Sequence, residues 1–328
     1  VSPDQLRIVD PGVRLLDRWR TLTATTGMRH LRSPAVHHLD LAPWSLRRFA
    51  SKRSNRKLGA FAPPYDRPAL ALFNTHCEMV IDTFGLRQCH IQAKAVGASV
   101  HSDGIDFQLS TGQNITARNV VLAMGASDQP DYPDWAPKDD HRVHHVFEPG
   151  FSGWPTSQET VALIGGGISA CQVAMRLVKE GHRVHLVSRH ALRKHQFDSE
   201  PGWLGPKFMT GFSRIQDYGR RRALIADARH KGSVPPDVYR ALHRAIQGEL
   251  LDWHEANIER FEIEAAGLSM HLTTGEHLQP TQVLLATGFE SRRPGGVVID
   301  QMISSGSLPV AACGYPIVDP ALRWHPRI

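Results

Sequence analysis

The 328-residue chain carries a formal net charge of +6 at pH 7 and is 41% hydrophobic and 21% charged, a composition typical of a soluble globular protein long enough for two domains with full cores. Its basic residues are spread along the sequence, which argues against nucleic-acid binding, and no apolar run approaches the ~20 residues of a membrane span. Its four cysteines, Cys77, Cys89, Cys171 and Cys313, form no C-x-x-C pair, which argues against a zinc site or a redox-active disulfide and, with no leader peptide visible, favours a reduced, cytoplasmic protein.

The first part of the chain predicts a short strand, helices and a polar loop. Residues 6–10 have the apolar pattern of a strand that ends in an acid, Asp10. Helical spacing follows around residues 15–22, which include Trp19, and again over 44–53 and 70–84. The stretch 28–38, which holds Ser33 and His38, is polar and loop-like. Asp10 is either a ligand for a nucleotide ribose or the acid that closes the following turn.

From residue 89 the pattern changes to short alternating segments separated by turns. Strands are expected over 90–96, 99–101, 105–109 and 120–123. This spacing predicts a β-meander that feeds a buried strand, which ends at Met124 and Gly125. The Pro- and His-rich stretch 128–149 predicts a linker.

Residues 161–189 predict a β-turn-α-β unit. An apolar strand leads into glycines, a helical pattern follows, and a second apolar strand closes the unit. In the pattern G-x-G-x-x-A, Gly165 permits a tight turn, Gly167 lets the backbone approach a pyrophosphate, and Ala170 allows close helix packing. The pyrophosphate would sit on the helix N-terminus, where amide donors and the helix dipole favour an anion. The predicted ligand-binding residues are Gly165, Gly166, Gly167, Ile168, Ser169 and Ala170. The alternative is a Gly-rich turn in an unrelated α/β domain.

The end of the second strand indicates which nucleotide binds. NAD sites usually place Asp or Glu there to hold the ribose 2′-hydroxyl, whereas this chain has Ser188 and Arg189. Cations within reach of a 2′-phosphate favour NADPH; the alternative is that Arg189 is a solvated loop residue. Beyond this unit, residues 190–260 are mostly helical in pattern, residues 261–289 return to strands, and the tail has no long periodic element.

An internal repeat relates residues 106–126 to 269–289, with a constant offset of 163 positions and no gap. Both segments share a Thr-Gly turn and end in Leu-Ala-x-Gly. The strand ends expected to face nucleotides are Met124 and Gly125 in one copy and Ala286, Thr287 and Gly288 in the other; the alternative is a simple tight turn. Aligning Val187-Ser188 with Val9-Asp10 gives a second offset of 178, which places the counterpart of Gly165 before the first residue. We therefore expect the first unit to have its ribose acid without its phosphate loop.

Two dinucleotide units, the second inserted in the first, resemble flavoproteins of the glutathione-reductase type and flavin monooxygenases; the lack of a cysteine pair excludes the disulfide-reductase branch. The stretch from Ile8 to Trp19 and the segment 31–38 are similar to monooxygenases related to lysine and ornithine N-hydroxylases. The linker that ends at His145 is loosely similar to the flavin monooxygenase fingerprint. The resemblance implies FAD reduced by NADPH, with Asp10 on the adenosine ribose and the segment 31–38 near the flavin. The FAD residues it implies are Asp10, Trp19, Ser33, His38, Met124 and Gly125.

We therefore predict an α/β protein with two Rossmann-like dinucleotide-binding domains, each a three-layer unit of parallel sheet plus β-meander. Residues 1–155 and 290–328 form an FAD-binding-type domain that lacks its N-terminal phosphate loop and its C-terminal helix, and residues 156–289 form the inserted NAD(P)H-binding domain. The predicted function is an NADPH-dependent flavoprotein oxidoreductase, monooxygenase-like, acting on a small nucleophilic substrate. The alternative is a truncated or degenerate NADP(H)-binding module without flavin or catalysis. The sequence predicts no metal site and identifies no catalytic residue, substrate or oligomeric state.

Overall fold

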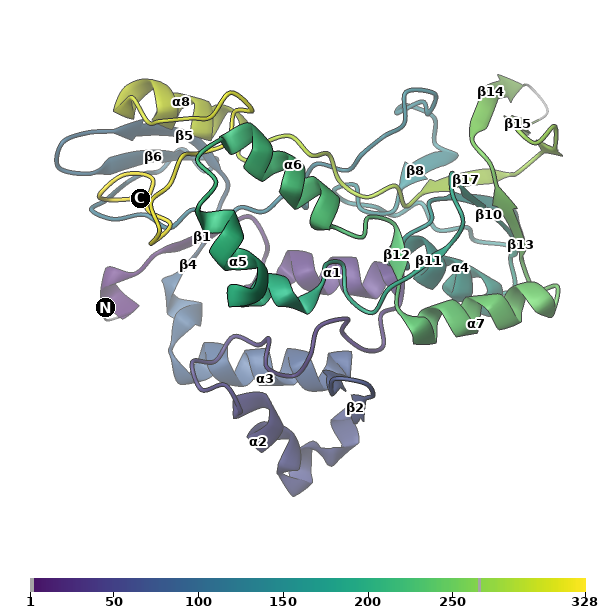
Figure 1. Cartoon of the computed structure of the whole chain (residues 1–328), viewed down its shortest axis with the longest axis horizontal. Helices are drawn as coiled ribbons and strands as arrows, with labels where there is room; N and C mark the ends of the chain where they lie inside the picture. Colours follow the sequence, from purple (N-terminus) through teal and green to yellow (C-terminus); the bar gives the residue numbers. More distant parts are fainter. Residues whose placement is uncertain (1–2, 265–266) are drawn as a thin grey trace.

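The structure, a computed structural model, describes residues 3–264 and 267–328, and a five-stranded parallel sheet lies at one end of it (Figure 1). The strand order is β13 (Asp252–Glu255), β10 (Arg183–Ser188), β9 (Thr160–Ile164), β17 (Gln282–Leu285) and β8 (Val143–His145). All neighbouring pairs are parallel, so the carboxyl ends of the strands meet at one edge. Strands β10 and β13 lie on one side of β9, and β17 and β8 lie on the other. Such a change of direction in the strand order is a switch point, which is where α/β sheets bind ligands.

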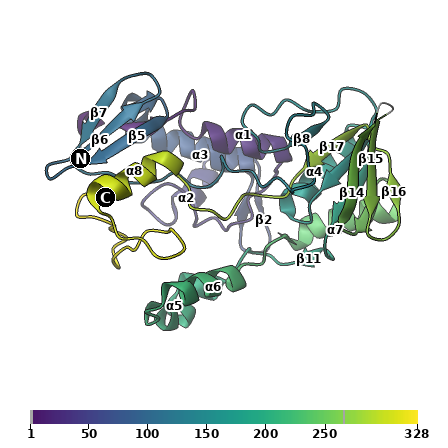
Figure 2. The ribbon, with the colours of Figure 1, turned by 90° about the horizontal axis from the view of Figure 1, so that it is seen from above.

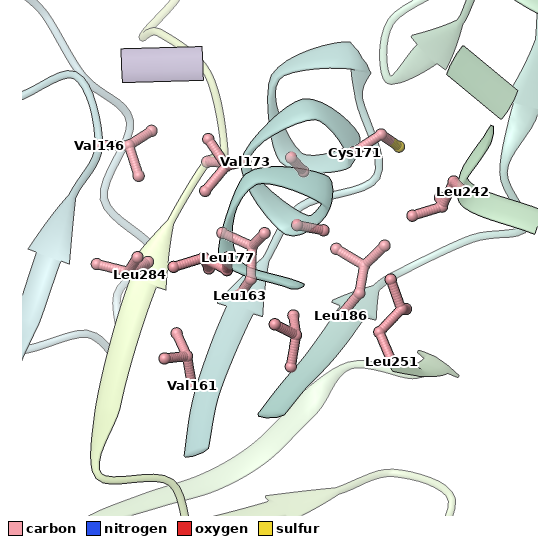
Figure 3. Close-up of a cluster of buried hydrophobic side chains, with 14 of the residues drawn as sticks. Val146, Val161, Leu163, Cys171, Val173, Leu177, Leu186, Leu242, Leu251 and Leu284 are labelled. Carbon is pink, nitrogen blue, oxygen red and sulfur yellow. The ribbon is translucent and has the colours of Figure 1, made fainter. Parts of the chain in front are cut away.

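Helix α4 (Ile168–Lys179) connects β9 to β10 and confirms the predicted β-turn-α-β unit. Its apolar face, which includes Val173 and Leu177, is fully buried against Leu163 and Leu186 of the sheet (Figure 3). Burying each leucine stabilises the fold by about 1.5–3 kcal/mol. The helix ends because Gly181 adopts a left-handed φ of 90° and the next amide, of His182, donates to Leu177 O at 3.1 Å.

The other helices surround this sheet or form the opposite end of the molecule. Helices α1 (Asp17–Thr26) and α7 (Pro236–Gln247) pack on α4, and α2 (Ser45–Ser51) and α3 (Leu70–Thr83) share a separate small core. Helices α5 (Pro206–Ser213) and α6 (Tyr218–Ala228) reach out from the rest of the structure and contain no buried residue (Figure 2). The short elements are the 3-10 helices Pro3–Gln5, Arg53–Leu58, Leu86–Cys89 and Pro201–Leu204 and the strands β2 (Phe61–Ala62), β3 (Arg67–Pro68), β11 (Arg193–Lys194) and β12 (Ser233–Val234). No helix in the described residues is long and apolar enough to cross a membrane.

Two antiparallel three-stranded sheets confirm the internal repeat. The first contains β5 (Ala95–Val100), β6 (Ile105–Leu109) and β7 (Asn114–Ala117), and the second contains β14 (Ile258–Glu264), β15 (Gly267–Leu272) and β16 (His277–Leu278). Their hydrogen bonds match at the offset of 163. The Leu109 amide donates to Gln113 O and the Leu272 amide to Glu276 O, both at 2.9 Å. Even a side chain is matched, because the amides of Lys94 and Asn257 donate to the hydroxyls of Ser110 and Thr273, both at 3.0 Å.

The second offset, of 178 positions, also holds in the structure. Strand β1 (Ile8–Asp10) pairs in parallel with β4 (His90–Gln92), with Asp10 opposite Gln92. In the other copy, Ser188 of β10 lies opposite Glu255 of β13. Two equivalent amides then donate to these strand ends, Ala93 to Asp10 O at 3.1 Å and Ala256 to Ser188 O at 2.9 Å. Asp10 and Ser188 are therefore equivalent positions of one architecture.

Three sequence-based expectations are wrong. Residues 120–123 form no strand, and Val121 is 91% exposed, although its counterpart Leu284 is fully buried. The reason is that β17 lies between β9 and β8, whereas no strand in the described structure flanks residues 120–123. The expected linker 128–149 contains β8, which joins the edge of the parallel sheet. The tail contains helix α8 (Gly296–Gly306), whose Val298, Ile299 and Met302 pack on the β5–β6–β7 sheet (Figure 2).

This difference between the two copies predicts contrasting effects at equivalent positions. We expect Leu284→Ala to lower the free energy of unfolding by about 2–5 kcal/mol, because it leaves a cavity in a close-packed core. Val121→Ala should change it by less than about 0.5 kcal/mol, because its side chain is already in water. Urea unfolding followed by circular dichroism measures both values. Similar losses for the two variants would contradict the placement of residues 120–123.

Candidate nucleotide-binding site

The glycine turn after β9 lies at the switch point of the sheet and can be built only from glycine at its first position. Gly165 has φ of 145°, and a Cβ there would lie 2.5 Å from Ala286 O and 3.2 Å from the Cβ of Ala170. The Gly165 amide donates to Val187 O at 2.9 Å. The turn is therefore held between the carboxyl ends of β10 and β17, and the small Ala170 lets α4 begin directly beside it, as the sequence pattern predicts.

The N-terminus of α4 is the one strong anion-attracting feature of this turn. Gly167 is the N-cap and provides no side-chain hydrogen bond to the helix. The first amides of an α-helix have no partner inside the helix, so they remain available to an external acceptor. Gly166, Ile168 and Ser169 are half-buried rather than enclosed. These backbone donors, with the helix dipole, suit a phosphate group.

At the end of β10, Ser188 and Arg189 have different environments. Ser188 is 1% exposed, and its hydroxyl donates to His190 O at 3.0 Å and accepts from Trp253 Nε1 at 2.9 Å. The Ser188 hydroxyl therefore already donates one hydrogen bond and accepts another within the protein. Arg189 is exposed and forms no hydrogen bond or ion pair within the described part of the chain. The guanidinium of Arg189 is therefore the group at this strand end that is free to meet a phosphate.

The end of β17 presents backbone rather than side chains. Ala286 is buried and its amide donates to Ile164 O at 2.8 Å. The Thr287 hydroxyl donates to Asp131 O. Gly288 has φ of 94° and open space where a Cβ would be. Of these three predicted residues, only Gly288 offers a surface that a ligand can approach closely.

Three of the residues predicted to contact FAD, Asp10, Trp19 and His38, form hydrogen bonds within the protein. Asp10 Oδ1 accepts the Gly12 amide at 2.8 Å, as expected for an acid that closes a turn, and this leaves its second oxygen unengaged. Trp19 Nε1 donates to Asn74 Oδ1 at 2.9 Å. Both ring nitrogens of His38 are occupied, by Pro43 O at 3.1 Å and by the Asp40 amide at 3.2 Å.

The remaining predicted FAD residues lie near the surface. Ser33 is half-buried, Met124 is 43% exposed, and Gly125 has φ of 61° with open space at its Cβ position. Met124 also contacts the start of α8, since a Cβ on Gly295 would lie 2.6 Å from its Cε. Gly125 therefore resembles its counterpart Gly288, but Met124 packs on a helix.

Sequence reasoning missed two residues that lie against the glycine turn. His190 is 3.3 Å, at Cε1, from the Cβ position of Gly166, and Gly232 is 3.6 Å, at Cα, from the Cβ position of Gly167. Gly232 follows α6, more than 60 residues after the turn, and no local pattern marks it. His190 follows Arg189 directly, so the search for a cation at the strand end could have included it.

The described residues contain no group of three or more His, Cys, Asp or Glu side chains placed to hold a metal ion. All four cysteines are free. Burial raises the pKa of Cys77 to about 11 and that of Cys171 to about 12, so both remain protonated thiols at neutral pH.

His145, at the carboxyl end of β8, is fully buried beside the candidate site. Its Nδ1 accepts the Phe147 amide at 3.1 Å. Burial lowers its pKa to about 4. The unfolded chain binds the same proton with an ordinary pKa of about 6.5, so the folded state holds fewer protons between these values. Its contribution to stability is complete above about pH 6.5 and is lost as the pH falls toward 4.

We expect His145→Asn to flatten the decline in the free energy of unfolding between pH 6.5 and 4, because an asparagine oxygen can still accept the Phe147 amide but does not titrate. Over this pH range, the two proteins should differ in their loss of unfolding free energy by at most about 3 kcal/mol. Urea unfolding at several pH values measures it. His141→Asn is the matched control, since the His141 side chain is 88% exposed. Parallel curves for wild type and His145→Asn would contradict the burial of a neutral imidazole.

Comparison with known proteins finds similarity in a sequence profile over part of the chain and in fold over nearly all of it. Residues 75–223 match the sequence profile of the family described as pyridine nucleotide-disulphide oxidoreductase. No curated protein sequence matches the chain significantly. The chain is similar in structure to ornithine hydroxylase from Pseudomonas aeruginosa, with 17% identity and a TM-score of 0.66, over 94% of this chain and 80% of that one.

Two further solved structures are similar over nearly the whole chain. L-lysine 6-monooxygenase from Pseudomonas syringae has 16% identity and a TM-score of 0.69, covering 95% of this chain and 79% of its own. An ornithine N-hydroxylase from Kutzneria sp. 744, described with reduced FAD, NADP+ and L-ornithine, has 15% identity and a TM-score of 0.72, covering 95% and 80%. The chain thus has the Rossmann-like α/β fold of these N-hydroxylating monooxygenases and resembles them, as the sequence predicts.

Proposed function

We propose that the chain binds NADPH at the glycine turn and works as an NADPH-dependent flavoprotein oxidoreductase of the monooxygenase type. The observation that carries the proposal is the turn itself, at the switch point of a parallel sheet, with an uncapped helix N-terminus on one side and a free Arg189 on the other. The similarity to enzymes whose names describe N-hydroxylation supports the reaction class.

The proposed role of each part follows from its contacts. The pyrophosphate lies on the first amides of α4, where backbone donors and the dipole act together. Gly165 allows the tight turn against β17, and Gly167 has no side chain on the backbone that the pyrophosphate approaches. The adenosine ribose lies at the end of β10, where the strand ends in Ser188 rather than in an acid that could hold a 2′-hydroxyl, and Arg189 pairs with the 2′-phosphate. Gly288 allows close approach of the dinucleotide at the end of β17.

For FAD, the described residues fit one end of the molecule. The unengaged Asp10 oxygen stands at the end of β1, equivalent to the end of β10, and can hold the adenosine ribose. Residues 120–123 form no strand beside it, so the sheet edge that frames the glycine turn in the other copy has no described counterpart here. When bound, FAD would accept reducing equivalents from NADPH and activate oxygen. The chain itself would position the two cofactors and exclude water.

We further propose that residues 1–155 with 290–328 form the FAD-type domain and residues 156–289 the NADPH domain, with β8 contributed to the edge of the latter sheet. The second candidate function is an NADP(H)-binding module that holds no flavin. The observation in its favour is that Asp10 Oδ1, Trp19 and His38 already form hydrogen bonds with other protein groups, namely the Gly12 amide, Asn74 Oδ1 and Pro43 O.

A visible spectrum with added FAD separates these two functions. For the flavoprotein we expect FAD to remain with the protein after gel filtration and to show a band at about 450 nm that NADPH bleaches. For the binding module, NADPH fluorescence changes on binding while no flavin is retained. A chain that binds FAD without bleaching by NADPH would contradict the proposed hydride transfer.

Arg189→Asp tests the nucleotide preference. We expect it to weaken NADPH binding by about 10- to 100-fold, because it removes a charge-assisted hydrogen bond to phosphate and adds repulsion, and to change NADH binding little. Isothermal titration calorimetry with each nucleotide measures both affinities. Arg240→Asp is the matched control, since Arg240 is exposed on α7 and forms no ion pair in the described structure. Equal losses for NADPH and NADH would remove Arg189 from the 2′-phosphate.

A further inference from the structure

Residues 229–234, which we name the strap, connect α6 to α7 and cross the front of the glycine turn. The strap is internally bonded, with the Lys231 amide donating to Arg229 O at 2.9 Å and the Ser233 amide to His230 O at 3.2 Å. Its end forms β12, which pairs in parallel with β11. Figure 1 shows these two short strands beside α4.

The strap lies where the proposed phosphate site needs space. A Cβ on Gly167 would be in ordinary van der Waals contact with Gly232 Cα, at 3.6 Å, so the strap lies about one methyl group away from the backbone of the turn. A phosphate group is larger than a methyl group. The His190 ring lies beside both segments, 3.3 Å from the Cβ position of Gly166 and 2.9 Å from that of Gly232.

The side chain of Arg32, from the N-terminal part of the sequence, forms a hydrogen bond to the strap. Arg32 Nη2 donates to Ser233 Oγ at 2.8 Å and to His195 O at 2.9 Å, and Arg32 Nε donates to Gln196 O at 2.8 Å. The guanidinium therefore joins the strap to the chain that leaves β11. His195 and His230 add a parallel ring stack with centroids 3.9 Å apart.

We infer that the strap covers the phosphate-binding face of the glycine turn, that NADPH binds only after the strap moves away from Gly167, and that Arg32 is the positioning residue that holds it closed. This inference rests on the proposed NADPH site. Because Arg32 belongs to the part of the chain assigned to the other cofactor, its contacts link the entry of NADPH to the arrangement of the two domains. Arg32 itself touches no part of the bound nucleotide.

Stopped-flow measurement of NADPH fluorescence on mixing with the full chain tests this inference. We expect Arg32→Ala to raise the association rate constant about tenfold, since three hydrogen bonds from a charged donor no longer favour the closed strap. Ser233→Ala removes one of these bonds and should raise the rate by a smaller factor. Arg183→Ala, at the opposite end of β10, should leave it unchanged.

The association rate distinguishes a strap from a merely structural arginine, because loss of local structure would slow or abolish binding rather than accelerate it. Unchanged or slower association in both Arg32→Ala and Ser233→Ala, with NADPH still binding, would overturn the strap and leave the NADPH site standing. Binding of NADPH to Arg32→Ala but not to the wild-type chain would support a strap that is almost always closed in the wild type. Failure of every variant to bind NADPH would overturn both proposals.

Discussion

The close contact between Gly165 and the carbonyl of Ala286 is the constraint on which the glycine turn and the start of α4 depend. A side chain at Gly165 would stand 2.5 Å from that oxygen, so the approach of β9 to β17 at their carboxyl ends requires glycine. The approach fixes where α4 starts, because the chain must reverse between the end of β9 at Ile164 and the start of α4 at Ile168. It also fixes the direction of the first helix amides. The placement of these amides is thus a consequence of packing at the switch point rather than of any charged side chain.

Arginine side chains that donate to backbone carbonyls hold the N-terminal part of the chain to the five-stranded sheet. Arg18 donates to Ser127 O and, at 2.7 Å, to Phe147 O. Arg176 of α4 donates to Ala24 O at 3.3 Å and Thr25 O at 3.2 Å at the end of α1, and its guanidinium lies 3.8 Å from the Trp154 ring centroid. The acceptors in these contacts are uncharged carbonyl groups. A planar guanidinium carries several N–H donors, so it can bond to more than one carbonyl at once.

A buried ion pair joins the same two parts. Arg67 is 2% exposed and its Nη2 lies 2.9 Å from Asp237 Oδ2, in the first turn of α7. Burial of the guanidinium is tolerated because a carboxylate meets it, and removing Asp237 would leave the buried guanidinium without its counter-charge. Arg32 and Arg67 both reach from the first hundred residues to the segment between β10 and β13. The helical and loop region before β4 is therefore attached to the part of the chain between β10 and β13 by arginine side chains.

Much of the nucleotide domain could be predicted from the sequence because its signals are local. The glycine pattern, the helix face with Val173 and Leu177, and the terminating Gly181 all lie within one stretch. The repeat also predicted that Asp10 and Ser188 are equivalent, which the matched pairings of β1 and β10 confirm. What could not be predicted depends on neighbours. Residues 120–123 repeat the pattern of β17 yet form no strand, since no neighbouring strand in the described structure takes their hydrogen bonds. The helix α8 had a readable spacing in Val298, Ile299 and Met302 that the surrounding glycines and prolines obscured.

Because Asp10 and Ser188 are equivalent, the ends of β1 and β10 can be compared residue by residue. Each side chain bonds to the residue two positions later, Asp10 to the Gly12 amide and Ser188 to the His190 carbonyl. Each therefore first stabilises its own strand-end turn. The carboxylate has a second oxygen that can still accept a bond from a ribose hydroxyl, whereas the serine hydroxyl is saturated by Trp253. In the proposed NADPH site, discrimination between nucleotides therefore belongs to the next residue along the chain, Arg189, which is a cation where the first copy has a proline.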